Sequence, residues 1–253
     1  MIPRYTSNFF CTPFLWLCIL LLAYSCEINY STEVTSTENK EKSIAEMSQE
    51  ACDCFSKQKG DIDARMAPCI KSTTFSQKVE LPEGYSIQDS VAAVENMKSK
   101  VDSMNSRKAA DMSAMMQTMV VSCDAFGSEF ETLYEKTYPV DSSVANLNSI
   151  KTLESRFQTA SIPDTAKKAV LNELIAKNIG ARRLAEGLRR CQQMKKLFKD
   201  ESGAYYASAF IYSLQGKYPL AINELAQESS SERNSDLNKM FIALMKRKAQ
   251  RNK

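Results

Sequence analysis

Apolar residues recur three or four positions apart from Ser43 almost to the C-terminus, and this spacing constrains the fold more than any other feature. It is the period of a helix with one buried face, whereas a half-buried strand alternates apolar and polar residues. Glycine and proline, at seven each, are too scarce for a turn-rich β-fold. The sequence therefore predicts an all-α protein of antiparallel helical hairpins, packed as a bundle or a short solenoid.

The expected helices follow from these apolar rows and from the residues between them. Ser43 and Asp141 are residue types that cap a helix start, Pro163 suits a first turn, and Gly180 suits a helix end. A connector is expected over 72–85, which contains a proline and a glycine. The helices themselves are expected near 43–55, 63–71, 91–104, 112–138, 144–157, 163–180, 184–199, 203–214, 218–227 and 236–250.

The first 26 residues have the layout of an export signal. Arg4 is the one charge before an apolar stretch from Phe9 to Ala23, and the chain turns polar directly after Cys26. A positive start, roughly 7–15 apolar residues and a small residue before the cut are typical of a secretory signal. A membrane-spanning helix needs about 20 apolar residues, so a cleaved signal is favoured over an uncleaved signal anchor.

The end of this signal resembles a relaxed form of the lipobox of bacterial lipoproteins. In Ala23-Tyr24-Ser25-Cys26, a small residue precedes the cysteine, while Ala23 and Tyr24 depart from the strict pattern. The resemblance implies that the Cys26 sulfur carries lipid and anchors an exported protein in the cell envelope, at the outer membrane or facing the periplasm. An ordinary cleaved signal is the alternative.

The rest of the chain divides into three parts. Residues 27–42 are rich in Ser, Thr, Glu, Lys and Asn and offer little apolar surface to bury, which predicts a disordered tether. Two helical subdomains are expected to follow, a cysteine-containing one over 43–138 and a second one over 141–253.

Composition excludes several kinds of chemistry. The chain has no histidine, which removes Ser-His-Asp and Cys-His triads and histidine metal sites. It also has no glycine-rich phosphate loop and no nucleophile elbow. A net charge of +3 is not the signature of a nucleic-acid-binding protein. We therefore expect a protein that is not an enzyme, needs no metal or other cofactor and does not bind nucleic acid.

Two side-chain patterns each allow a structural interpretation and a binding interpretation. Met112, Met115 and Met119 share one helix face and are expected to fill core, although methionine rows also form adaptable grooves or copper(I) sites. Basic residues gather over 182–199 and 246–253. We expect these stretches to be solvated faces or helix ends, and binding of an anionic partner is the alternative.

Five cysteines follow Cys26. Two of them, Cys52 and Cys54, point to opposite sides of a helix and should bond to different partners. In an oxidising compartment the simplest arrangement is two disulfides and one free thiol, with Cys54 bonded to Cys69 and Cys52 bonded to Cys123. Reduced buried thiols and a metal site are the alternatives.

The cysteine spacing over 43–138 resembles that of uncharacterised helical lipoproteins of bacteria, and this resemblance implies no reaction.

The segment 204–225 is similar to one tetratricopeptide repeat, a helical hairpin in which small residues let two helices pack closely while aromatic residues fill the gaps. An earlier copy, shifted by the family's period, matches at Leu171 and Leu174 but poorly at Gly187 and Cys191. An ordinary helical hairpin is the alternative. The residues that match the repeat are Tyr205, Ala209, Tyr212, Gly216, Tyr218, Ala221 and Leu225.

These observations favour a membrane-anchored, non-catalytic lipoprotein of the cell envelope that acts in protein–protein interaction or scaffolding. Its partner would be another protein, bound along the concave face of the helical hairpins. The alternative is a carrier that holds an apolar ligand in a cavity lined by the methionines.

Overall fold

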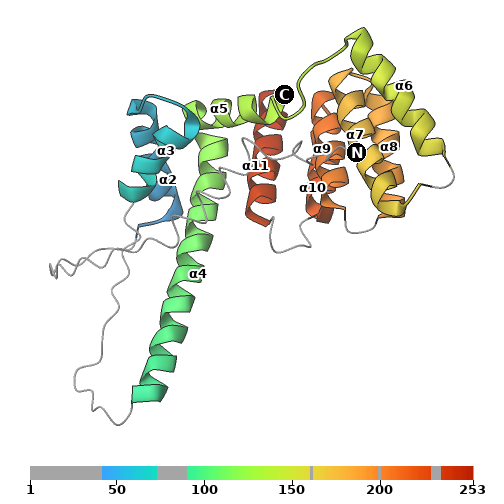
Figure 1. Ribbon diagram of the computed structural model, residues 1–253. Helices are drawn as coiled ribbons and strands as arrows, with labels where there is room; N and C mark the ends of the chain where they lie inside the picture. The colour runs from blue at the N-terminus through green and yellow to red at the C-terminus, as the bar shows by residue number, and fades with distance from the viewer. Residues whose placement is uncertain (1–41, 73–89, 160–161, 199–200, 229–234, 253) are drawn as a thin grey trace. The chain divides into compact units, whose positions relative to one another are not determined.

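The computed structural model describes residues 42–72, 90–159, 162–198, 201–228 and 235–252, and all regular structure within them is α-helical (Figure 1). The predicted all-α fold is therefore confirmed. These helices fall into two compact units, which divide between Met116 and Gln117. The helices are α2 (Ile44–Lys57), α3 (Ile62–Ser72), α4 (Ser90–Ser122), α5 (Asp124–Glu135), α6 (Val144–Gln158), α7 (Asp164–Gly180), α8 (Leu184–Leu197), α9 (Ser202–Leu214), α10 (Tyr218–Glu228) and α11 (Ser235–Arg251).

The first unit contains the hairpin of α2 and α3. Ser43 caps α2 as predicted: its hydroxyl accepts from the Glu46 backbone N–H at 3.2 Å, and the Glu46 carboxylate accepts from the Ser43 N–H at 2.8 Å. Phe55 is fully buried, and the Arg65 guanidinium lies 3.8 Å from the centre of its ring. Four-residue spacing of the buried Met47, Ala51 and Phe55 therefore gives α2 its packing face.

One helix was expected to run from Met112 to the residues before Pro139, and this prediction was wrong. The structure interrupts that helix at Cys123, which has an extended backbone with φ −96° and ψ 104°. α4 ends at Ser122 and α5 begins at Asp124. The apolar spacing continues across the interruption, so the sequence pattern alone does not reveal it.

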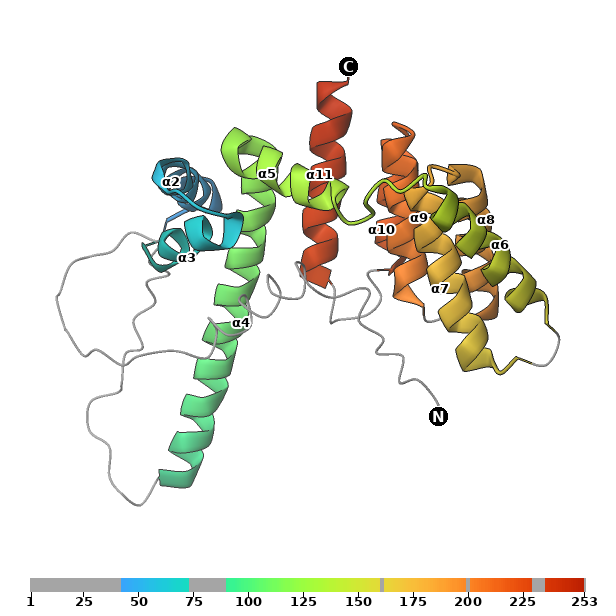
Figure 2. The ribbon, with the colours of Figure 1, turned by 45° about the horizontal axis from the view of Figure 1, so that its top comes forward.

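The second unit holds α5 to α11 and the last residues of α4. From α6 to α11 each helix packs against the next one along the chain, and α7 also packs against α9. Figures 1 and 2 show α7, α8, α9 and α10 side by side, and α5 lying crosswise to α11. The short connections α7–α8 and α9–α10 join helices that pack against each other as hairpins, in agreement with the predicted helical hairpins.

Local signals in the second unit are partly as expected. α7 ends at Gly180, as predicted. The cap of α6 is Ser143, whose hydroxyl accepts from the Asn146 N–H at 3.1 Å, rather than the predicted Asp141. Asp141 instead accepts from the Ser143 N–H at 3.1 Å, and hydrogen bonds from the side chain and the backbone of Ser143 lower the pKa of the Asp141 carboxyl.

The division between the units also lies earlier than the boundary near Pro139 that the sequence suggested. The reason is the packing of α5 and the residues after it. The Tyr134 and Tyr138 rings lie 5.1 and 4.9 Å from the ring of Phe210 in α9, centre to centre. These contacts join α5 to helices that follow much later in the sequence.

Candidate functional site

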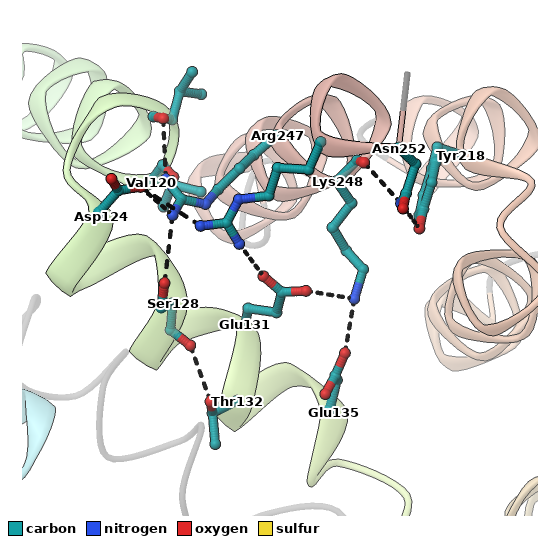
Figure 3. A network of polar contacts seen from close by, with 12 residues as sticks. Val120, Asp124, Ser128, Glu131, Thr132, Glu135, Tyr218, Arg247, Lys248 and Asn252 are labelled. Carbon is teal, nitrogen blue, oxygen red and sulfur yellow. Dashed lines mark hydrogen bonds and ion pairs between the residues drawn. The ribbon is translucent and has the colours of Figure 1, made fainter.

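Arg247 of α11 reaches into the corner between α4 and α5 (Figure 3). One guanidinium nitrogen donates to the backbone carbonyls of Val120 and Val121, at 3.3 and 3.1 Å. The other donates to the Asp124 carboxylate at 2.7 Å. The two carbonyls belong to the last turn of α4, where no further helical N–H is available to them. Arg247 therefore caps α4 and pairs with the first residue of α5.

Gly127 provides the space for this guanidinium. A Cβ at Gly127 would lie 2.5 Å from the Val120 carbonyl oxygen and 2.8 Å from the central carbon of the Arg247 guanidinium. No side chain fits there while both groups stay in place. Gly127 was not among the predicted site residues, although a glycine inside a helical pattern often marks such a close approach.

Further along the same two helices, α11 pairs with acidic residues of α5 (Figure 3). The Lys248 ammonium lies 2.8 Å from the Glu131 carboxylate and 2.7 Å from that of Glu135. Arg251 donates to Glu131 at 3.2 Å. Burial alone would lower the pKa of Lys248, but the hydrogen bonds that its ammonium donates to the two carboxylates more than offset it, so the pKa is raised. These cations of the basic stretch 246–253 thus face acids of α5 instead of standing alone in solvent.

An aromatic layer lies beside these ion pairs. The Phe241 ring of α11 lies 5.8 Å from that of Phe130 and 5.1 Å from that of Tyr134, both in α5. Tyr206 of α9 meets Phe241 edge-on at 5.8 Å. Aromatic side chains of α5, α9 and α11 therefore form one buried cluster, bordered by charged pairs.

The other basic stretch, 182–199, also makes intramolecular ion pairs. Arg190 of α8 pairs with Glu154 of α6 at 3.2 Å. Lys195 of α8 pairs with Glu224 of α10, and its ammonium lies 4.3 Å from the centre of the Tyr205 ring. These cations connect α8 to its neighbouring helices, whereas the sequence suggested a solvated face or a helix end.

The residues that resemble a tetratricopeptide repeat lie in the hairpin of α9 and α10. Ala209, Ala221 and Leu225 are completely buried and Tyr218 is nearly so, whereas Tyr205 and Tyr212 are half-buried. The Tyr218 hydroxyl accepts from the Asn252 side chain at 2.7 Å, which links α10 to the end of α11.

Gly216 forms the turn of this hairpin. Its φ of +71° lies in the left-handed region that favours glycine, and no heavy atom lies within 4 Å of the place of a Cβ. The neighbouring Lys217 N–H donates to the Tyr212 carbonyl at 2.9 Å. Gly216 is thus needed for its backbone conformation and not for space.

The cysteines follow the expected arrangement where the structure describes it. Cys54 and Cys69 form a disulfide between α2 and α3, as predicted. Cys52 and Cys123 are each disulfide-bonded too, and their bond to one another stays a prediction.

Cys191 is the free thiol within the described residues. It is buried in α8, and burial raises the pKa of its thiol to about 12. A thiol with so high a pKa is a poor nucleophile at neutral pH.

The methionine row is packed as core. Met115, Met116 and Met119 are between 0 and 2% exposed, while Met112 is half-buried. A shallow pocket of about 330 Å³ lies elsewhere, between the ends of α6 and α8 and the start of α7, with Phe157, Lys167 and Leu197 among its lining residues.

Two absences concern only the part of the chain that the structure describes. No group of three or more Cys, Asp or Glu there is arranged to hold a metal ion. None of the described helices is both long and apolar enough to cross a membrane. Cys26, the predicted signal over 1–26 and nearly all of the predicted tether over 27–42 lie outside the described residues.

Comparison with known proteins adds no relative: no family model, no curated protein and no solved structure matches this chain.

Proposed function

We propose that this chain is a lipid-anchored, non-catalytic lipoprotein of the cell envelope that binds a protein partner through the helical array α6–α11. The proposal is supported by a sequence pattern typical of an export signal up to Cys26, together with an array in which each helix packs against the next. Arrays of this kind present extended surfaces to other proteins.

A repeat-like construction of the array supports this proposal. The family's period of about 34 residues places Gly187 of α8 at the position of Ala221 in α10. Glycine matches the repeat pattern poorly at this position, but both residues are buried, and a Cβ at Gly187 would lie 3.0 Å from the Ile211 side chain of α9. A small residue at each place lets the helix approach its neighbour. We therefore propose that α7–α8 and α9–α10 are two tetratricopeptide-like units, with α11 as the first helix of a third.

The chemistry of the described residues supports a binding role. The free thiol is buried with a raised pKa, and Arg190, Lys195 and Lys248 pair with carboxylates of neighbouring helices. Such groups hold helices together and offer no activated nucleophile. The carrier alternative gains no support, because the methionines that would line its cavity fill core.

The lipid anchor is tested by metabolic labelling with a radioactive fatty acid in a bacterial expression host. The wild-type chain should incorporate label, and Cys26→Ala should not, because its sulfur is the proposed attachment point. Cys18→Ala, which changes a cysteine within the proposed signal, is the matched control and should label like the wild type. Equal labelling of wild type and Cys26→Ala would reject the anchor.

Partner binding is tested by placing a photo-crosslinking amino acid at exposed positions in the intact envelope. Leu197 of α8 and Leu220 of α10 are 50 and 44% exposed and lie in the array. Glu50 of α2, with a side chain 48% exposed, serves as the matched control outside it. A discrete crosslinked protein from the array positions but not from Glu50 supports the proposal. Crosslinks from none of them, or equally from all, would contradict it.

A further inference from the structure

α5 carries a row of aromatic residues spaced four apart. Phe126, Phe130, Tyr134 and Tyr138 continue this register past the helix end at Glu135, and all four are no more than 5% exposed. Residues four apart lie on one face of a helix. A helix with such a row and acidic residues beside it has the form of a ligand that binds in a groove between other helices.

The surface that receives this row belongs to α9 and α11. Phe210 of α9 contacts the rings of Tyr134 and Tyr138, and Phe241 of α11 contacts those of Phe130 and Tyr134. The rings of Tyr206 and Phe241 connect α9 to α11 at the same place. The centre of this contact is therefore aromatic and dry.

The rim of the same contact is charged. Lys248 and Arg251 of α11 face Glu131 and Glu135 of α5, and Arg251 and Glu135 are about half exposed. A buried aromatic centre with a polar, solvated rim is the usual anatomy of an interface between two proteins. The contact resembles an interface also in its sequence distance, since 113 residues separate Glu135 from Lys248.

We propose that α5 is an internal occupant of the partner-binding face of α9 and α11, and that the partner is an acidic amphipathic helix with aromatic residues four apart, which takes the place of α5. This inference rests on the proposed partner-binding function and deepens it. The charge of the rim favours this occupant, because Lys248 and Arg251 lose their partners when α5 leaves and regain them from an acidic helix.

Hydrogen exchange of the full mature chain tests whether α5 can leave. The amides of 124–135 should exchange through an opening that leaves α7–α10 protected. The free energy of this opening should be smaller than that of the amides of α7–α10, and it should depend less on denaturant concentration. If 124–135 opens only together with α7–α10, α5 is an inseparable part of the core and the inference fails.

A peptide of residues 122–140 tests whether the face accepts a second helix. Its binding is measured by fluorescence anisotropy to the wild-type chain and to a Glu131→Gln/Glu135→Gln double variant, in which the chain's own α5 is held more weakly. The variant should bind the peptide at least tenfold more tightly. An Asp164→Asn/Glu173→Gln variant, with two exposed acids of α7 changed, is the matched control and should bind like the wild type. A peptide carrying Phe130→Ala and Tyr134→Ala should not bind.

The results separate this inference from the proposed function. Equal peptide binding by the double variant and the wild type, or none to either, overturns the inference. Far-UV circular dichroism of the double variant is the control for its folding and should match that of the wild type. Envelope crosslinks from the array without opening of α5 would reject the inference alone. Opening and peptide binding without any crosslinked partner would reject the proposed function instead.

Discussion

Gly127 is needed because it has no side chain, and not because of its backbone conformation. A methyl group there meets a backbone carbonyl at 2.5 Å and the Arg247 guanidinium at 2.8 Å, and neither can move without breaking a hydrogen bond. We predict that Gly127→Ala lowers the free energy of unfolding by about 1–3 kcal/mol, as overpacking does. Urea denaturation followed by circular dichroism measures the change.

Gly203→Ala is the control for this substitution, because both glycines lie in helices. At Gly203 a Cβ meets its nearest neighbour at 3.5 Å, which is an ordinary contact. Alanine there should leave stability unchanged or raise it by roughly 0.5–1 kcal/mol, because it is the better helix former. Equal destabilisation by both substitutions would show that the Arg247 contact is not the cause.

Tyr134 has a buried hydroxyl that finds no hydrogen-bond partner among the described residues. Burying such a group without a partner costs roughly 1–3 kcal/mol. We predict that Tyr134→Phe leaves the free energy of unfolding at pH 7 unchanged or raises it, although the substitution removes a hydroxyl group from the core. Thermal unfolding of both proteins at pH 7 measures this difference, and a clear loss of stability would reveal a partner for the hydroxyl.

The same substitution should change the response to alkaline pH. Burial raises the pKa of Tyr134 in the folded state above its value of 10 in the unfolded chain. The unfolded state therefore releases its proton first, and stability falls as pH rises above about 10. Tyr134→Phe removes this contribution, so its advantage over the wild type should grow between pH 9 and 11. An advantage that stays constant over this range would contradict the raised pKa.

At the scale of elements, most helices could be predicted because their signals are local. Ser43 caps α2, Gly180 ends α7, and the ranges expected for α9, α10 and α11 agree with the structure to within one or two residues. These features depend on side chains close in sequence to the backbone groups that they satisfy.

The break at Cys123 could not be predicted in this way. No proline or glycine marks it, and the apolar row Met119, Cys123, Phe126 runs through it with helical spacing. The carbonyls freed by the break are satisfied by Arg247, more than a hundred residues later. A helix end that depends on such a distant group leaves no local sequence signal.

The candidate site could not be predicted for the same reason. The sequence shows the basic stretch 246–253, but it does not show which acidic residues face these cations. Glu131 and Glu135 are one helical turn apart, as are Lys248 and Arg251, and this complementary spacing is the signal that was present. Pairing two such patterns requires knowing which helices meet, which only the tertiary structure provides.

The hairpin of α2 and α3 offers a prediction at this scale. Its disulfide joins cysteines 15 residues apart, and closing a loop of that size stabilises a fold by about 3 kcal/mol in the chain-entropy model. We predict that Cys54→Ser/Cys69→Ser lowers the opening free energy of the amides of α2 and α3, measured by hydrogen exchange, by roughly this amount. The amides of α7–α10 in the second unit serve as the internal reference and should keep their protection. Unchanged protection of α2 and α3 would mean that their apolar core suffices.

For the whole molecule, the cysteines predict a simple thiol count. In a chain beginning at Glu27, four of the five cysteines are disulfide-bonded and Cys191 is buried with a raised pKa. We predict no reaction with Ellman's reagent at pH 8 in the native state and one thiol per chain in 6 M guanidinium. The variant Cys191→Ser should give none under either condition. Two or more thiols after unfolding would contradict the bonding of Cys52 and Cys123.

α5 is synthesised before α11, the helix against which it packs. Protein chains emerge from the ribosome N-terminus first, so Glu135 appears 113 residues before Lys248, the residue that it contacts. At about 5–20 residues per second, α5 waits roughly 6–23 seconds for its contacts with α11. During that interval the apolar face of α5 that packs on α11 in the folded chain has no cover from that helix. Premature termination before α11 would remove Phe241 and leave the part of the row that packs against it, at Phe130 and Tyr134, without that cover.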